Sequence, residues 1–373
     1  MNRAMFESCT SSRKKWFPLR KRSSATASDS QRGSLAPTPD LPRRASATRE
    51  GNQKVRPLDF VIIGAQKSGT TSLYRYLQWH PSIYLLPEKE APFFNLDAAY
   101  LRGWEWYCQE FFGGAPEGKL WAKATPSYMA DQRVPQRLHQ AMPATKLIAL
   151  LRNPVDRAFS HYRMAVKRGL EKRSFAESVI DQLQPASLAR DRLLPVGIEQ
   201  QGYLVMGEYS RILGNYLERF SRNQLLVLFT EDLAAQPRYV IRRILRFLGI
   251  EETFEPPNLG KHYHVGGTAR RVPFNAEDVS GNRWFNLFLG CFSAHQQKLL
   301  RRRFHFWFKV WNTRPDPAGG KMPPEIRRLL VCFYQDDITR LHQLLGGPVP
   351  WLDFNLPQQR QDPPFSLVAD DEP

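Results

Sequence analysis

Two stretches of this 373-residue chain combine cations, glycines and hydroxyl residues in an order that suits phosphate binding. GAQKSGTTS begins at Gly64, and RNPVDRAFS begins at Arg152. An apolar run typical of a buried parallel strand precedes each stretch, and an amphipathic helix follows it. At such a turn, backbone N–H groups and the positive end of the helix dipole converge on an anion. We therefore expect two anion-binding turns, although a plain helix cap would read the same way in the first.

The lysine of the first turn is displaced from its place in nucleoside-triphosphate-binding loops. Gly64 and Gly69 have the glycine spacing of such a loop, but Lys67 comes two residues before Gly69 instead of directly after it. After the second strand, Arg152 stands where a magnesium-dependent hydrolase would carry a metal-binding aspartate. Two cationic turns without a metal suit a ligand with phosphates at two separate places, such as 3′-phosphoadenosine 5′-phosphosulfate (PAPS). A P-loop-type nucleotide kinase or hydrolase is the alternative.

Strand and helix patterns alternate through the middle of the chain. This alternation predicts an α/β fold with a single doubly wound parallel sheet flanked by helices, as in P-loop NTPases. Ligands of such folds bind at the carboxyl ends of the strands, where both turns lie. The expected strands are Phe60–Ile63, Leu120–Ala124, Leu147–Leu151 and Leu225–Phe229, and the expected helices are Thr70–Trp79, Pro154–Arg168, Tyr203–Phe220, Pro237–Leu248, and two near Ser293–Val310 and Pro324–Leu345.

The two ends of the chain differ from this middle part. Residues 1–57 hold thirteen Lys and Arg against four Asp and Glu, and few of them are apolar, so we expect a disordered basic tail. An organelle transit segment is the alternative, and the tail could touch anionic membrane. Residues 58–355 are expected to form one domain. Residues 356–373 are expected to be a loose acidic tail.

The composition limits the classes of partner and the cellular compartments that we expect. A formal charge of +17 indicates an anionic partner, and we expect no specific nucleic acid among the candidates. The four cysteines have no zinc-site spacing, and whether Cys291 pairs with Cys332 stays open. No apolar run reaches the roughly 18 to 20 residues that cross a bilayer. We therefore expect no transmembrane segment and a cytoplasmic location, with an organelle as the alternative.

Taken together, these segments resemble the P-loop-like PAPS-dependent sulfotransferases, and most of all the branch of heparan sulfate N- and O-sulfotransferases. GAQKSGTTSL matches the family's 5′-phosphosulfate loop and LLRNPVDRAFSHY its 3′-phosphate motif, while HPSIYLLPEKEAPFFN, KATPSY and LLVLFTEDLAAQP extend the match from roughly Leu58 to Phe354. The resemblance implies transfer of a sulfonate from PAPS to a hydroxyl or amine, in a carbohydrate or a small molecule, without a metal. An inactive, sulfotransferase-like anion-binding protein is a further alternative.

The resemblance also implies residue roles. Lys67 would stabilise the charge on the bridging oxygen as the sulfonate leaves. Glu90, three residues before the paired phenylalanines in PEKEAPFF, would be the general base, with Glu88 as the fallback. Lys123 of KATPSY would act near the acceptor and the donor sulfonate. The donor-binding residues would be Lys67, Ser68, Gly69, Thr70, Thr71 and Ser72 at the 5′ end, and Arg152 and Ser160 at the 3′-phosphate.

The chain departs from the 3-O-sulfotransferase pattern at two positions. Pro92 replaces a histidine that would assist the base, and Asn95 replaces an aspartate. Asn95 is closer to the N-sulfonating type, so N- versus O-sulfonation stays open.

Other polar residues are expected to have structural roles. We expect His80 to cap or pack and His161 to face the core. Glu231 and Asp232 are expected to cap the helix that follows them. The glycine- and arginine-bearing loop 262–271 could cover the nucleotide, or it could be a solvated basic loop.

Overall fold

The computed structural model of the protein describes residues 55–194, 202–261 and 321–355, together with 268–270, 313–315 and a few residues between 296 and 308. The expected terminal tails therefore lie outside the described residues, apart from positions 55–57. Cys291, most of loop 262–271 and much of the expected helix 293–310 also lie outside them, so the pairing of Cys291 with Cys332 and the role of the loop both stay open.

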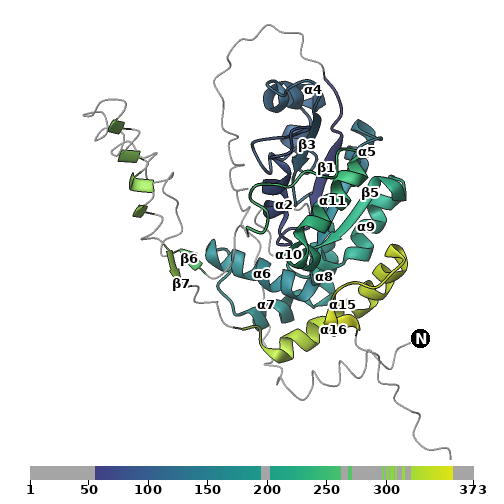
Figure 1. The fold of residues 1–373 in the computed structure, drawn as a ribbon. Coiled ribbons are helices and arrows are strands. Elements are labelled where there is room, and N and C mark those ends of the chain that lie inside the picture. Colours follow the sequence, from purple (N-terminus) through teal and green to yellow (C-terminus); the bar gives the residue numbers. More distant parts are fainter. Residues whose placement is uncertain are drawn as a thin grey trace, which may run out of the picture. The chain divides into compact units, whose positions relative to one another are not determined.

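The core is a five-stranded sheet in the order β2-β3-β1-β4-β5, and every neighbouring pair in it is parallel (Figure 1). The expected doubly wound α/β fold is therefore confirmed. A short antiparallel pair, β6 with β7, was not expected. The strands are β1 Phe60–Gly64, β2 Ile83–Leu85, β3 Leu120–Ala124, β4 Lys146–Leu151, β5 Leu225–Phe229, β6 Thr268–Arg270 and β7 Thr313–Pro315.

Helices connect these strands, and local sequence signals set their ends. At α6, for example, Asn153 accepts a hydrogen bond from the backbone N–H of Val155 and Pro154 occupies the first turn. The α-helices are α2 Thr70–Leu77, α3 Asp97–Tyr100, α4 Gly103–Tyr107, α5 Val134–Ala141, α6 Pro154–Lys167, α7 Phe175–Gln182, α8 Pro185–Leu193, α9 Tyr209–Leu217, α10 Thr230–Ala235, α11 Pro237–Leu248, α15 Pro324–Leu345 and α16 Leu352–Asn355. Shorter turns of other helix types are η1 Cys108–Phe112, η2 Val205–Gly207 and η3 Arg222–Gln224.

Alternate residues of the central strands pack against helices on opposite faces of the sheet. Phe60 and Ile62 join the cluster that contains the apolar residues of α2 and α11. Val61 and Ile63 join the cluster that contains α5, α6, α9 and α15. A sheet buried on both faces explains why its strands read as continuous apolar runs. It leaves the carboxyl ends of the strands as the edge from which polar loops can project.

Two sequence expectations need correction. The strand β2 was not expected, because its three residues are too short to give a recognisable pattern. The helix expected over Tyr203–Phe220 is interrupted: η2 comes first, Glu208 breaks the helical conformation, and α9 begins at Tyr209. Just before this break, residue 207 has to be glycine, because an added Cβ would meet the phenol of Tyr334 at 2.8 Å.

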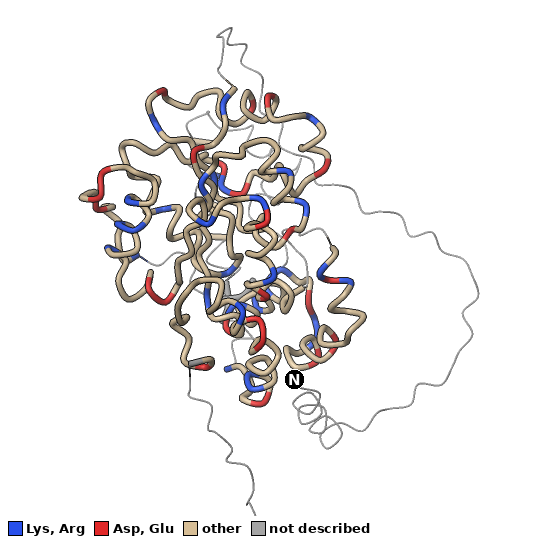
Figure 2. Tube along the Cα trace, turned by 90° about the vertical axis from the view of Figure 1, so that its right-hand side faces the viewer, with Lys and Arg blue, Asp and Glu red and all other residues tan. Residues whose placement is uncertain are grey.

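Lys and Arg are distributed over the whole described part of the chain and are interspersed with Asp and Glu (Figure 2). A binding site therefore has to be identified from local groups of charges. Among the described residues, none of the helices combines the length and the apolar character needed to cross a bilayer.

Candidate functional site

The two anion-binding turns lie side by side because β1 and β4 are hydrogen-bonded neighbours. Ile62 pairs with Ile148, and Gly64 pairs with Ala149. Beyond the strands, the backbone N–H of Ala65 donates to the carbonyl of Leu150 at 2.8 Å. The two turns named from the sequence therefore meet at one edge of the sheet.

A direct contact joins the two cationic residues of these turns. Arg152 Nη1 donates to the backbone carbonyl of Lys67 at 3.3 Å. Both side chains are half-buried. The backbone of Lys67 has a φ of 73°, which is uncommon for a residue other than glycine. Gly69, with a φ of 86°, precedes α2, and no side chain caps that helix among the described residues.

Like charges around Lys67 mark this edge as a site for an anion. The pKa of Lys67 is lowered to about 8, first by burial and then by the positive charges of Arg168, Arg152 and Lys167, while Glu90 acts in the opposite direction. Four cations close enough to repel one another raise the free energy of the unliganded protein. Bound phosphate groups would relieve that repulsion, so the arrangement favours an anionic ligand.

Two hydroxyl groups tie the turns together. Thr230, the residue directly after β5, has its Oγ1 at 2.6 Å from the carbonyl of Ser68 and at 2.8 Å from the carbonyl of Leu151. Tyr209 donates from its phenol to the carbonyl of Arg152 at 2.8 Å. Neither residue was singled out from the sequence. The position of Thr230 at the end of a strand was the available signal for it, whereas Tyr209 gives no local signal.

Residues from the C-terminal part of the described chain contact the second cationic turn and the start of α6. Asn153 Nδ2 donates to Asp353 at 2.7 Å while Asn153 Oδ1 caps α6. Arg327 forms ion pairs with Asp353 at 2.6 Å and with Asp156 at 2.7 Å. Trp351 is buried between the rings of Tyr209 and Phe229. The residue after Arg152 is therefore held by contacts that come from the other end of the sequence.

The expected general base, Glu90, reaches the same edge from the loop after β2. Its backbone N–H donates to the carbonyl of Ala124 at the end of β3, 3.1 Å away, and its φ is 70°. Its carboxylate is half-exposed and pairs with Lys89. Its charge raises the pKa of Lys67, opposite to the effect of the surrounding cations. Glu88, the fallback, is exposed.

Lys123, by contrast, lies in the interior. Its side chain is buried, and Nζ lies 2.6 Å from the carbonyl of Ala91, 2.7 Å from the phenol of Tyr107 and 2.8 Å from the phenol of Tyr128. Burial lowers its pKa well below the ordinary value. Lys123 therefore contacts the residue that follows Glu90 from within the protein, and its expected role near the acceptor and the donor sulfonate stays a prediction.

The remaining donor-site residues lie where the motifs put them. Ser68 is buried in the turn, Thr70 to Ser72 form the first residues of α2, and Ser160 lies half-buried on α6. Their contacts with a donor stay predictions.

The residues expected to be structural are mostly so. His80 accepts a hydrogen bond from the backbone of Ser82 and packs edge-on against Phe254. His161 is buried against Tyr203. Glu231 lies in the first turn of α10 without a side-chain cap contact, because its carboxylate accepts from the backbone N–H of Asn153 instead.

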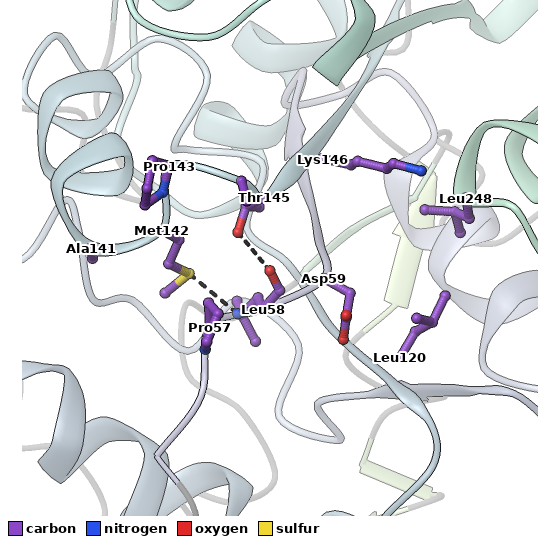
Figure 3. A pocket seen from close by; sticks show the side chains of 11 residues that line it. Pro57, Leu58, Asp59, Leu120, Ala141, Met142, Pro143, Thr145, Lys146 and Leu248 are labelled. Atoms are coloured by element: carbon purple, nitrogen blue, oxygen red, sulfur yellow. Dashed lines mark hydrogen bonds between the residues drawn. The ribbon is translucent and has the colours of Figure 1, made fainter.

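A pocket of about 410 Å³ lies at the opposite edge of the sheet, where β1, β3 and β4 begin (Figure 3). Its polar groups have protein partners: Asp59 accepts from the backbone of Trp121, Thr145 donates to the carbonyl of Leu58, and Lys146 donates to the carbonyl of Phe247. This pocket is remote from the cationic turns and offers no unused charge to a ligand.

Comparisons with known proteins agree with the family that the two cationic turns indicate. A family model described as the sulfotransferase domain matches residues 57–262. The chain is 31% identical over 291 residues to heparan sulfate glucosamine 3-O-sulfotransferase 6 of Mus musculus, covering 78% of this chain and 72% of that protein. It is 33% identical over 319 residues to the bifunctional heparan sulfate N-deacetylase/N-sulfotransferase 3 of Homo sapiens, covering 81% of this chain and 32% of that protein.

A solved structure adds agreement in three dimensions. The sulfotransferase from Alicyclobacillus acidocaldarius superimposes with a TM-score of 0.55 at 27% identity, covering 79% of this chain and 98% of that one. The resemblance carried by the two cationic motifs is confirmed. This chain belongs to the sulfotransferase family.

Proposed function

We propose that this protein transfers the sulfonate group of PAPS to a hydroxyl or amine of a carbohydrate. The observation that carries the proposal is the meeting of Lys67 and Arg152 at the ends of two adjacent strands, with Glu90 beside them. Family membership supports the reaction class. Two of the relatives named above are heparan sulfate sulfotransferases, which supports a glycan as acceptor.

The residues present fit the donor. PAPS carries anionic groups at both ends of its adenosine, and the two turns offer cations at two places along one edge. Burial lowers the pKa of Lys67 most, and the repulsion by Arg168, Arg152 and Lys167 that lowers it further is expected of a site that binds negative charge. Bound donor supplies the sulfonate and a phosphate leaving group. We assign Lys67 to Ser72 to its 5′ end, and Arg152 and Ser160 to its 3′-phosphate.

The reaction asks for positioning and for charge neutralisation more than for covalent chemistry. The acceptor oxygen or nitrogen forms a bond to sulfur while the bond from sulfur to the bridging phosphate oxygen breaks. Lys67 holds the negative charge that develops on that bridging oxygen. Glu90 takes the proton that the acceptor loses, and its present partner Lys89 must release it for that step.

The proposal includes sulfonation of an amine and sulfonation of a hydroxyl. Pro92 and Asn95 depart from the 3-O pattern, and Asn95 Nδ2 donates to Ser127 at 3.1 Å. N-sulfonation and O-sulfonation of a glucosamine-containing glycan are thus the two acceptors to test first. The cytoplasmic location expected from the sequence stays a prediction.

Calorimetric titration with 3′-phosphoadenosine 5′-phosphate (PAP) tests the donor assignment. We expect binding in the presence of a chelator and a loss of about tenfold or more in affinity for Arg152→Ala, since hydrogen bonds to charged groups contribute roughly 1.5–3 kcal/mol. Arg219→Ala, which removes an exposed arginine paired with Glu218, is the matched control and should bind normally. Preference for ATP with magnesium would favour a kinase instead.

Transfer of labelled sulfonate from PAPS to N-desulfated and to O-desulfated heparan-type glycans tests the reaction. Incorporation into either polymer, abolished in Lys67→Met, supports the proposal. Normal PAP binding without transfer to any hydroxyl or amine acceptor would identify an inactive anion-binding protein.

A further inference from the structure

The interior position of Lys123 is the feature that the proposed reaction does not use. The side chain is 1% exposed, and both phenols that contact it, Tyr107 and Tyr128, are fully buried. Lys123 lies on β3, Tyr107 at the end of α4, and Tyr128 in the loop after β3. Lys123 and Tyr107 share the carbonyl of Ala91, the residue after Glu90, as a hydrogen-bond partner.

The hydrogens in this cluster can be counted. The phenol oxygen of Tyr128 accepts from the backbone N–H groups of Phe93 and Phe94, at 3.1 and 3.3 Å. A phenol has one proton to donate. Lys123 Nζ lies 2.8 Å from the same phenol oxygen. That oxygen has two lone pairs, and the two backbone N–H groups already occupy them.

A neutral amine completes this pattern, and an ammonium group does not. With one lone pair, Nζ can accept the proton of Tyr128 and donate its two hydrogens to Ala91 and Tyr107. Tyr107 then donates its own proton to the carbonyl of Ala91 at 3.0 Å. An ammonium group has three hydrogens and no lone pair, so its contact with Tyr128 would bring a third hydrogen to an oxygen that already accepts two.

The electrostatic surroundings agree with this count. No carboxylate forms an ion pair with Lys123 among the described residues, and burial is the cause of its lowered pKa. The titratable groups that face it are the phenols, whose own pKa values are raised by burial; Glu88 acts on Tyr107 and Asp131 acts on Tyr128. Nζ also lies 4.5 and 4.9 Å from the two ring centroids. Such contacts contribute about 2 kcal/mol to a desolvated cation, less than the several kcal/mol that burying an unpaired charge costs.

We propose that Lys123 is a neutral amine that positions the Glu90 loop from within the protein and is not a cation of the donor or acceptor site. Through Ala91 it fixes the residue that follows the proposed base, and through Tyr128 it fixes Phe93 and Phe94. Glu90 itself has a left-handed backbone and is tied to β3 at Ala124. The assignment of a positioning role rests on the proposed function of Glu90, whereas the assignment of a neutral amine does not.

The charge state is tested on the intact protein by nuclear magnetic resonance, with lysine labelled at Cε by carbon-13. The resonance that disappears in Lys123→Met identifies the residue. At neutral pH we expect that resonance at the position of a neutral amine, apart from the other lysines. A resonance at the ammonium position, titrating only in the ordinary lysine range, would overturn the proposal. This measurement needs no enzymatic activity.

The positioning role is tested by the order of two variants. Lys123→Met keeps an uncharged chain of similar length, whereas Lys123→Arg forces a permanent charge into the interior. We expect PAP affinity to be unchanged in Lys123→Met and kcat to fall on the order of 10²-fold, as for a misplaced catalytic group. Lys123→Arg should be less stable and less active than Lys123→Met. A donor-site cation would give the reverse order and a weaker affinity for PAP in Lys123→Met.

Tyr128→Phe removes the phenol that we place in the same network. It should reproduce the loss of kcat with normal PAP affinity, and the double variant with Lys123→Met should lose little more than the worse single variant. Tyr334→Phe is the control, because it removes another fully buried phenol that donates to the carbonyl of Leu204 at 2.9 Å. Equal losses of kcat in the control would reduce the effect to general destabilisation and sink the positioning role. If the wild-type protein shows no transfer at all, the proposed function fails, and the resonance experiment still decides the charge state.

Discussion

Lys67 and Glu90 both hold a left-handed backbone, with φ values of 73° and 70°, and the negative charge of Glu90 acts directly on the pKa of Lys67. No other residue apart from glycine has a positive φ in the described part of the chain. Such conformations cost on the order of 1–3 kcal/mol each and persist where the surrounding structure imposes them. The two residues that we assign to leaving-group stabilisation and proton transfer are therefore placed by their backbones as well as by their side chains.

Replacing Lys67 by Met should remove activity and stabilise the unliganded protein. We expect kcat to fall by hundreds-fold or more, by analogy with the loss of one electrostatic donor in other active sites. Below about pH 8 the folded protein carries a proton on Lys67 at an energetic cost, which the variant avoids. Thermal unfolding at neutral pH should show a higher Tm. Lys321→Met, at an exposed position, is the control for both measurements.

The lowered pKa of Lys67 also predicts how the wild-type protein responds to pH. Between about pH 8 and the ordinary value of 10.5, the unfolded chain binds the Lys67 proton more than the folded one, so the contribution of this group to stability rises with pH. Catalysis runs the other way, because only the protonated amine can hold the leaving oxygen. Values of kcat/KM for PAPS should fall above about pH 8. A flat profile that is the same in Lys67→Arg would contradict this account.

Glu90→Gln should separate catalysis from donor binding. The amide keeps the shape of the carboxylate but cannot take the acceptor's proton, so we expect a loss of about 10²- to 10⁴-fold in kcat with unchanged affinity for PAP. Glu88→Gln is the matched control in the same loop. Its side chain is exposed, and it should remain active. Loss of activity in Glu88→Gln alone would move the role of the base to that residue.

Thr230→Val should weaken donor binding through the backbone. The substitution keeps the shape of the side chain and removes the hydroxyl that lies between the carbonyls of Ser68 and Leu151. We expect PAP affinity to fall severalfold and stability to fall by about 1–3 kcal/mol, as for an unsatisfied buried group. Thr145→Val removes a comparable hydroxyl from the opposite edge of the sheet, 2.6 Å from the carbonyl of Leu58. That control should lose stability and keep its PAP affinity.

Asp353→Ala should loosen the second turn without touching the donor. Asn153 and Arg327 would both lose their carboxylate partner, and Arg152 is the next residue along the chain. We expect weaker binding of PAP by calorimetry, with the 3′-phosphate most affected, so adenosine 5′-phosphosulfate should lose less affinity than PAP. Glu252→Ala breaks an exposed ion pair with Arg246 and should change neither affinity. Equal losses for both ligands would place the effect elsewhere in the site.

The central strands and the two cationic turns could be predicted because their signals are local. β1, β3, β4 and β5 each read as an apolar run, and the turns after β1 and β4 carry their cations within a few residues. Parallel pairing then required both turns to share one edge, so the meeting of Lys67 and Arg152 was implied before any coordinate was known.

The supporting residues could not be predicted, because their partners are remote in sequence. Thr230 is 162 residues from Ser68, and Asp353 is 200 residues from Asn153. Lys123 shows a second reason why a prediction can fail. The sequence places it on a strand near the site, but the direction of its side chain depends on α4 and on the loop after β3. Its expected role as a catalytic cation stays a prediction that the contacts of its side chain do not favour.

The contact between Asn153 and Asp353 also bears on how the protein is made. A ribosome exposes the chain from its N-terminus, so both cationic turns emerge long before the segment that holds the second of them. The nascent polypeptide can build the sheet from β1 to β5 and still lack the Asp353 and Trp351 contacts at that edge. Full affinity for the nucleotide should therefore arise only after Asp353 has been synthesised and has left the ribosome.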